Sequence, residues 1–289
     1  MPPLASGWTA FAVFVLGTVV GSFLNVVIGR LPAGESVVWP GSRCPKCKHA
    51  LAWYENVPLL SWLVLCARCR HCQAPISARY PAVELLTALL FLACFHRFGL
   101  SWSLLRGLLM VGFLVPLAFI DLEHWVLPFQ LTLPGAVVGL LTAIPLGRTV
   151  LLESAIGAAA GFLFFFGLEV LLRIILRREA LGAGDKWLML LVGAFLGYRP
   201  LFGVLLLSNV QGALVGGALL LARGRAGPAA PAPGTPATED DWVPGATHVP
   251  FGPWIALSAL EVLLLGPWLA ATFPGPFIWL LTGQPWELQ

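Results

Sequence analysis

Two aspartates are the first candidates for chemistry, because each lies where a long apolar run ends or begins. Asp121 closes one such run, and Asp185 ends the sequence Gly-Ala-Gly-Asp at 182–185. A carboxylate at a membrane boundary is energetically costly, so it is a candidate functional group. Two carboxylates in one site cannot both ionise comfortably, so one keeps a proton while the other acts as a base. Such a pair can activate water to attack a peptide carbonyl.

Each aspartate also has a structural interpretation. Asp185 is suited to cap the helix that follows it, and the glycines permit the turn before that cap. Asp121 precedes Leu-Glu-His and could lie in the polar headgroup region. Taken singly, each residue leaves both interpretations open. Taken together, in segments with very few other acids, the two aspartates favour one shared site for acid proteolysis.

A second group of candidate residues is rich in cysteine. Cys44 and Cys47 form one Cys-x-x-Cys pair, Cys69 and Cys72 form another, and 21 residues separate the pairs. Each such turn can direct two thiolates at one ion, and two turns complete the tetrahedral set that structural zinc prefers. We therefore expect these cysteines to bind zinc. The ion would contribute on the order of 10 kcal/mol to a loop with little hydrophobic core of its own.

Other arrangements of the same loop remain open. Cys66 also forms a Cys-x-x-Cys pair with Cys69, which makes the register ambiguous. His49 or His71 could replace a thiolate. The closely spaced cysteines resemble part of an iron–sulfur motif whose usual fourth cysteine is missing, and no βαβ pattern supports a thiol-redox role. Cys94 lies in an apolar segment and is typical of a small buried side chain.

The composition decides the class of protein. Of the 289 residues, 58% are hydrophobic and 11% are charged, and the mean hydropathy is +0.85. A soluble enzyme of this length would have about a quarter of its residues charged. The chain is therefore expected to be a polytopic protein embedded in membrane lipid. Its net charge of +3 is too small to indicate nucleic-acid binding.

Apolar segments of about 20 residues predict an all-α fold with about eight transmembrane helices. The first segment has no Lys or Arg before Arg30, unlike a cleavable signal, so we expect it to be a permanent span. The expected spans lie near residues 8–29, 81–97, 102–120, 130–147, 150–176, 186–198, 200–222 and 253–273.

The basic residues indicate the orientation, because cytoplasmic loops are enriched in Lys and Arg. With the N-terminus outside, all but four of the 17 basic residues fall on the cytoplasmic side. The exceptions are Arg97, Arg106, Arg148 and Arg199. This orientation puts the two aspartates at the cytoplasmic ends of their helices, and therefore at the same depth.

These patterns divide the chain into consecutive parts. They are a first transmembrane helix at 1–29, a small zinc-binding cytoplasmic domain at 30–80, a transmembrane catalytic core at 81–223, a flexible cytoplasmic loop rich in Pro and Ala at 224–250, and a last transmembrane helix with a C-terminal tail at 251–289. The composition of 224–250 is typical of an extended linker, and we assign no chemistry to it.

Several segments together give the chain a family resemblance. They are 21–27, 44–47, 53–62, 69–72, 79–84, Asp121 with the Leu-Pro at 127–128, 182–185 with 193–197, and 250–253. With these segments the chain resembles the type IV prepilin leader peptidases, which are bacterial membrane aspartyl proteases. The resemblance covers nearly the whole chain in the right order.

The resemblance implies the roles of the candidate residues. Asp121 and Asp185 would be the catalytic pair, and the two cysteine pairs would hold zinc in a cytoplasmic domain. The family acts at the bacterial inner membrane and removes the basic leader of type IV prepilins or type II secretion pseudopilins, cutting after a glycine. Many members then methylate the new N-terminal residue with S-adenosylmethionine. No Gly-rich motif after a strand marks a site for that cofactor.

Two positions depart from the family pattern. Phe129 follows the Leu-Pro at 127–128, where the family usually has an acidic residue. Trp187 stands two positions after Asp185, where the family usually has Lys.

Two other functions fit some of these features. One is a transporter in which the aspartates bind a cation or relay protons, and the other is a structural protein of a secretion platform. A transporter would more naturally have its acids near the midplane and show repeated halves. The expected depth of the aspartates therefore favours the peptidase.

Overall fold

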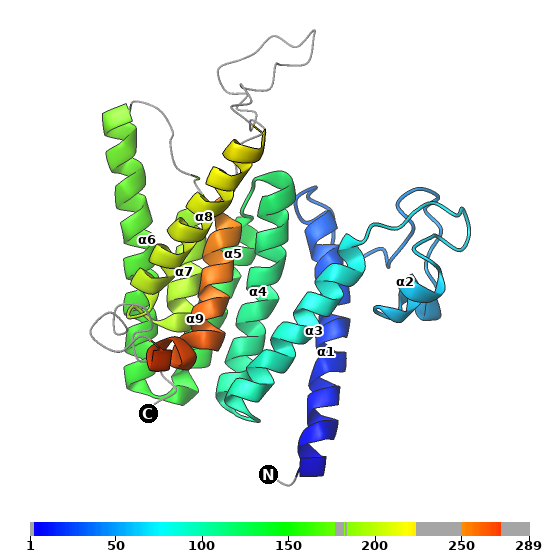
Figure 1. Ribbon diagram of the computed structural model, residues 1–289, viewed down its shortest axis with the longest axis horizontal. Helices are drawn as coiled ribbons and strands as arrows, with labels where there is room; N and C mark the ends of the chain where they lie inside the picture. Colours follow the sequence, from blue (N-terminus) through cyan, green and yellow to red (C-terminus); the bar gives the residue numbers. More distant parts are fainter. Residues whose placement is uncertain (1–2, 177–181, 183, 224–249, 273–289) are drawn as a thin grey trace.

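Helices form all the regular structure in the described part of the chain, which comprises residues 3–176, 182, 184–223 and 250–272. The computed structural model has a helix at each expected span (Figure 1). These helices are α1 (Pro3–Arg30), α3 (Arg79–Phe98), α4 (Trp102–His124), α5 (Phe129–Ala143), α6 (Arg148–Leu176), α7 (Asp185–Leu196), α8 (Leu201–Arg223) and α9 (Gly252–Thr272). Short helical turns are η1 (Trp53–Asn56), α2 (Leu60–Val64) and η2 (Ile144–Leu146). The predicted all-α class is confirmed.

The helices differ in their capacity to cross a membrane. Among the described residues, 6 helices are long and apolar enough: α1, α3, α4, α5 with η2, α6 and α8. α7 has 12 residues, so it is about 18 Å long, shorter than the roughly 30 Å hydrocarbon core of a bilayer. The apolar stretch Gly252–Gly266 of α9 is also short. The chain is a multi-pass membrane protein, and the predicted number of spans is approximate.

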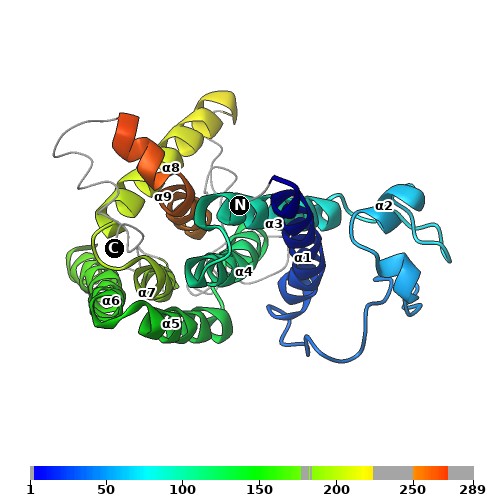
Figure 2. The same cartoon turned by 90° about the horizontal axis from the view of Figure 1, so that it is seen from below.

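The helices form two packed groups that meet at α4 (Figure 2). α1 lies against α3, and both contact α4. On the other side, α7 lies between α5 and α6, and α9 packs against α4 and α8. The shortest of these helices, α7, is therefore enclosed by longer ones.

The close packing of α6 on α7 depends on glycine. A Cβ atom at Gly193 would lie 2.2 Å from the carbonyl oxygen of Gly157, and one at Gly161 would lie 2.6 Å from that of Met189. Small residues let membrane helices approach closely and gain dispersion energy. This contact fixes the position of α7, whose first residue is Asp185.

Arg106 of α4 supports the other end of α7. Its side chain is buried and donates to the carbonyl oxygens of Ala194, Phe195 and Gly139 at 2.8, 2.7 and 2.7 Å. These carbonyls lie toward the C-terminal ends of α7 and α5, where backbone acceptors lack helical partners and a cation is favoured. The sequence analysis counted Arg106 only as one of four basic residues on the outer side. The structure gives it a further role, because it lies inside the bundle and bonds to two helix ends.

Residues 31–78 form a cysteine subdomain beside the bundle, where α1 ends and α3 begins (Figure 1). Its buried residues are Cys44, Glu55 and Cys69. Arg30, at the end of α1, donates to the Pro40 carbonyl oxygen at 2.6 Å. With so little buried apolar surface, the subdomain depends on polar anchors and on its cysteines.

Candidate functional site

The two aspartates meet at one end of the bundle. Asp121 lies near the end of α4, Asp185 begins α7, and each residue is only 6% exposed. The two carboxylates interact electrostatically. The fold therefore brings together the two acids that the sequence singled out, although 63 residues lie between them.

Asp185 is not the residue that caps α7. The N-cap position belongs to Gly184, and no side chain provides a cap hydrogen bond there. The interpretation of Asp185 as a capping residue is therefore wrong. Its carboxylate is buried in the site and is free of that structural task.

A third segment completes the aspartate site. The backbone N–H of Gly252, at the start of α9, donates to Asp121 Oδ2 at 3.0 Å. A Cβ atom at this position would lie 2.5 Å from the same oxygen, so only glycine permits the approach. The N-terminus of a helix favours a negative charge beside it. Asp121 is thus held by the start of α9.

Leu127 fills the space between these segments. A Cβ atom at Gly184 would lie 2.6 Å from Leu127 Cβ, and one at Gly252 would lie 3.3 Å from Leu127 Cδ1. The glycine before Asp185 therefore lets the turn into α7 lie directly on Leu127. The loop after α4 and the starts of α7 and α9 are packed as one unit.

This arrangement is suited to general acid–base chemistry. Two buried carboxylates that interact can share a proton, so that one acts as a base and the other as an acid. The pair would titrate as a unit.

The two residues that depart from the family pattern contact each other. The rings of Phe129 and Trp187 lie 4.8 Å apart between centroids, at 84°. An edge-on aromatic contact thus occupies the two positions where the family usually has an acid and a lysine. The neighbouring Lys186 instead donates to Glu169 of α6 at 2.6 Å.

The paired cysteines converge on one point. The four Sγ atoms of Cys44, Cys47, Cys69 and Cys72 all lie within 4.8 Å of one another. The distance between Cys44 Sγ and Cys72 Sγ is 3.8 Å, which is about the edge of a tetrahedron with 2.3 Å zinc–sulfur bonds. Cys66 is exposed and lies outside this cluster. The donor set therefore fits a tetrahedral metal ion, and the alternative register through Cys66 is wrong.

The two cysteine turns have the same backbone pattern. In each, the first cysteine accepts an N–H bond from the residue four positions later and donates to the carbonyl five positions later. Lys48 and Gln73, at equivalent positions, both have positive φ angles, 60° and 56°. Backbone donation from Cys47 lowers the pKa of the Cys44 thiol, whereas the pKa of the neighbouring Cys47 thiol is raised, so in the metal-free cluster the thiolate is favoured at Cys44 and not at Cys47. His49 and His71 stack on each other, with 4.6 Å between ring centroids.

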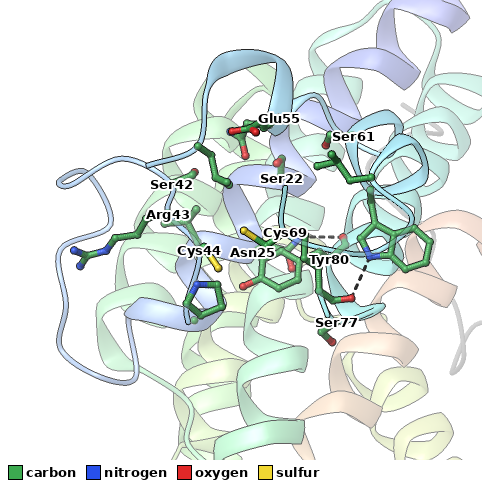
Figure 3. A pocket seen from close by; sticks show the side chains of 18 of the residues that line it. Ser22, Asn25, Ser42, Arg43, Cys44, Glu55, Ser61, Cys69, Ser77 and Tyr80 are labelled. Carbon is green, nitrogen blue, oxygen red and sulfur yellow. Dashed lines mark hydrogen bonds between the residues drawn. The ribbon is translucent and has the colours of Figure 1, made fainter. Parts of the chain in front are cut away.

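A cavity of about 630 Å³ lies between the cysteine subdomain and the adjoining ends of α1 and α3 (Figure 3). The side chains around it come from both: Ser22 and Asn25 of α1, Tyr80 of α3, and Cys44 and Cys69 of the cysteine turns. Glu123, two residues after Asp121, also lines it. The cavity therefore reaches the end of α4, the helix that also carries Asp121.

Some contacts at this end were not foreseen from the sequence. The Gly252 N–H bond to Asp121 is one, and the ion pair between Arg79 of α3 and Glu123 of α4 is another. In the sequence, only the family resemblance, to which the segments 79–84 and 250–253 contribute, pointed to these residues. Their partners depend on how the helices pack.

Comparison with known families gives matches along most of the chain. Residues 15–98 match the bacterial peptidase A24 N-terminal domain, and residues 108–217 match the type IV leader peptidase family. No solved structure matches the sequence significantly.

Curated relatives align with nearly the whole chain. A prepilin leader peptidase/N-methyltransferase of Myxococcus xanthus (strain DK1622) is 48% identical over 96% of each chain. Proteins of the same name from Aeromonas hydrophila and Pseudomonas aeruginosa are 39% and 34% identical, over 90% and 93% of this chain and 92% and 96% of theirs. With this identity over almost its full length, the chain belongs to the type IV leader peptidase family.

Proposed function

We propose that the chain is a membrane aspartyl endopeptidase that removes the leader from type IV prepilins or type II secretion pseudopilins. We further propose that it methylates the new amino terminus with S-adenosylmethionine. The relatives named for both activities support this function. The observation that carries it is the meeting of Asp121 and Asp185, both buried, at one end of the bundle.

In the proposed reaction, Asp121 and Asp185 act as a pair. One carboxylate takes a proton from water, which attacks the carbonyl carbon of the scissile peptide bond. The other donates a proton to the carbonyl oxygen and later to the leaving nitrogen. The burial of both side chains within the protein limits access of bulk water to the pair.

The site would act at the cytoplasmic face of the bacterial inner membrane. The enrichment of basic residues in the loops at this end supports that orientation. A prepilin has a basic leader before an apolar helix. If the leader stays in the cytoplasm and the helix in the lipid, the junction between them lies at the depth of the aspartates.

Zinc would serve a structural role in the cytoplasmic part of the protein. Cys44, Cys47, Cys69 and Cys72 would hold it, since their sulfur atoms fit a tetrahedral site. The proposed division is a zinc-binding domain at 30–80 and a catalytic membrane core at 81–223. The Pro/Ala-rich loop at 224–250 lies, except for its last residue, outside the described residues.

Leader removal by the purified full-length protein in lipid tests this function. We expect Asp121→Asn and Asp185→Asn each to slow cleavage at least about 1,000-fold, because each removes a proton-transfer group. Asp240→Asn, a matched change in the 224–250 loop, should cleave as the unaltered protein does. Normal cleavage by either of the first two variants, measured by mass spectrometry, would refute the aspartate pair.

A further inference from the structure

We propose that the cavity beside the cysteine subdomain is the site of methyl transfer. In this site Glu84 accepts a proton from the newly formed peptide amine, and Asn25 orients that amine. This inference rests on the proposed function, because the amine arises by leader cleavage. According to this proposal, methyl transfer takes place at a different site from cleavage and uses different residues.

Glu84 is a buried carboxylate at the floor of the cavity. It lies on α3, is 7% exposed and lines the cavity wall. The Ser22 hydroxyl of α1 donates to it, and so does the Leu59 backbone N–H at 2.7 Å. A carboxylate has about four lone-pair positions, so these two bonds leave it with acceptor capacity for a ligand.

Asn25 provides a second acceptor, on the neighbouring helix. Its Nδ2 group donates to the carbonyl oxygens of Gly21 and Tyr80 at 3.3 and 3.0 Å. Because both partners are acceptors, the amide orientation is fixed, and Oδ1 must face away from them. This Oδ1 is buried and has no hydrogen-bond partner among the described residues. Asn25 is 3% exposed and lines the cavity. Its unpaired Oδ1 could therefore accept a hydrogen bond from an N–H group of a ligand.

The helices hold these two acceptors in a fixed relation. A Cβ atom at Gly21 would lie 2.7 Å from the Glu84 Cα, so α1 and α3 touch at this level. Asn25 bonds to Tyr80 one turn further along both helices. The two acceptors therefore lie about one helical turn apart, on rigid elements.

The subdomain contributes a strained turn to the same place. Leu59 has φ 60° and ψ −51°, and the Leu60 N–H bonds to the Pro58 carbonyl at 2.6 Å. This is the rare form of γ-turn, which a residue with a side chain adopts at a cost. The turn directs the Leu59 N–H at Glu84. Backbone strain of this kind concentrates at functional sites.

The rest of the cavity fits S-adenosylmethionine. About 630 Å³ is within the range of roughly 300–1,000 Å³ for small-molecule sites. The cofactor has cationic groups, a carboxylate and an adenine ring. The lining offers carboxylates, the cations Arg43 and Arg70, and the flat ring of Trp62.

The cavity extends to the end of α4, the helix that carries Asp121. Glu123 and Arg79 line it and form an ion pair with each other. Glu123 lies two residues beyond Asp121 on α4. The end of the helix that supplies Asp121 is therefore part of the cavity wall.

The proposed step balances without any further reactant. The peptide ammonium gives a proton to the Glu84 carboxylate, and the free amine nitrogen attacks the methyl carbon of S-adenosylmethionine. The N–C bond forms as the C–S bond breaks, and the electron pair of that bond stays on sulfur. The products are the methylated amine, which carries a positive charge, and S-adenosylhomocysteine, whose sulfur is now neutral.

The test uses the full-length protein in lipid and three measurements. The first is leader cleavage of a prepilin. The second is transfer of a labelled methyl group to a peptide supplied already cleaved, which does not require the aspartates. The third is equilibrium binding of labelled S-adenosylmethionine without peptide. Failure of the first in the unaltered protein would count against the proposed function, whereas the other two test this inference.

The central variant is Glu84→Gln, which keeps an oxygen to accept the Leu59 N–H but removes the charge. We expect methyl transfer to fall by about 100-fold or more, with cofactor binding changed less than about threefold and cleavage less than about twofold. Glu153→Gln, a matched change near the opposite end of the bundle, should alter none of the three. Unchanged transfer by Glu84→Gln would overturn the proposal. A loss of cofactor binding equal to the loss of transfer would make Glu84 a cofactor contact and overturn its role toward the amine.

A second variant tests the location. Ser22→Phe should fill the floor of the cavity and weaken cofactor binding by about tenfold or more, with zinc content unchanged. Binding as tight as in the unaltered protein would place the cofactor elsewhere. If Ser22→Phe loses its zinc or its cleavage activity as well, Glu84→Gln still decides the proposal.

Discussion

The aspartate site and the cysteine subdomain lie at the same end of the molecule but are positioned in different ways. Asp121, Asp185 and Gly252 come from segments far apart in sequence, and buried helices bring them together. The cysteine turns are fixed by hydrogen bonds within a few residues, around a center with almost no apolar core. The first arrangement depends on helix packing, and the second on short-range hydrogen bonds and, as we propose, on a bound metal ion.

Because of this difference, we expect different structural changes to disturb the two sites. A change in the packing of α6, α7 or α9 should disturb the aspartates and leave the cysteine turns intact. Loss of the metal should disturb the subdomain and the cavity beside it, while the helices remain folded. The sets of variants below probe the two regions separately.

The largest effect should follow loss of the metal. In the double variant Cys47→Ser/Cys72→Ser, we expect the loss of about one zinc ion per chain. The subdomain would then lose the free energy of metal binding, which is on the order of 10 kcal/mol. The subdomain should then be cut rapidly by protease. Metal analysis and limited proteolysis measure this, and Cys66→Ser is the matched control. Full zinc content in the double variant would contradict the cluster.

A smaller but still large effect should follow Arg106→Met. The change leaves several buried carbonyl groups of α5 and α7 without their donor, at a cost of about 3–5 kcal/mol. We expect a lower unfolding temperature, with the zinc content unaltered. Arg148→Met is the control, because Arg148 is exposed at the start of α6. Equal unfolding temperatures for the two variants would mean that Arg106 does not support the helix ends.

Gly252→Ala should affect activity more than stability. The added Cβ would lie 2.5 Å from Asp121 Oδ2, so the carboxylate must move, and displacement of a catalytic group by about 1 Å can cost about 100-fold in rate. We expect leader cleavage to slow by about 10- to 100-fold. Gly266→Ala on the same helix is the control, since nothing lies within 4 Å of its added Cβ. Equal rates for the two variants would exclude this role for Gly252.

The smallest effect concerns the Phe129–Trp187 contact. We expect Phe129→Glu or Trp187→Lys alone to destabilise the protein, because each puts an unpaired charge against an aromatic ring. Together they supply the acid and lysine that the family usually has, and the double variant should recover about 1 kcal/mol relative to the sum of the single changes. A double-mutant cycle of thermal unfolding measures this coupling. Strict additivity would show that the two positions act independently.

Local patterns allowed much of the architecture to be predicted from sequence. Hydropathy located the helices, and the spacing of Cys44, Cys47, Cys69 and Cys72 identified the cluster, because the two residues of each pair are held by one turn. The common depth of the two aspartates followed from the orientation of the spans. These inferences need little knowledge of which helices are neighbours.

The remaining features depend on helix neighbours, which hydropathy does not specify. Arg106 looked like an outer basic residue, yet it bonds to α5 and α7. The sequence analysis assigned Glu84 no role. Only helix packing brings the Leu59 N–H to its carboxylate and places it near the unpaired Asn25 oxygen. The short length of α7 is tolerated because α5 and α6 enclose it.

The most direct test of the aspartate pair compares two reactions in one variant. Asp185→Asn, zinc-loaded and folded in lipid, should fail to remove a prepilin leader, with a rate at least about 1,000-fold below that of the unaltered protein. The same sample should still methylate a peptide supplied already cleaved. Leader removal at the unaltered rate would contradict the claim that this carboxylate, paired with Asp121, carries out the cleavage.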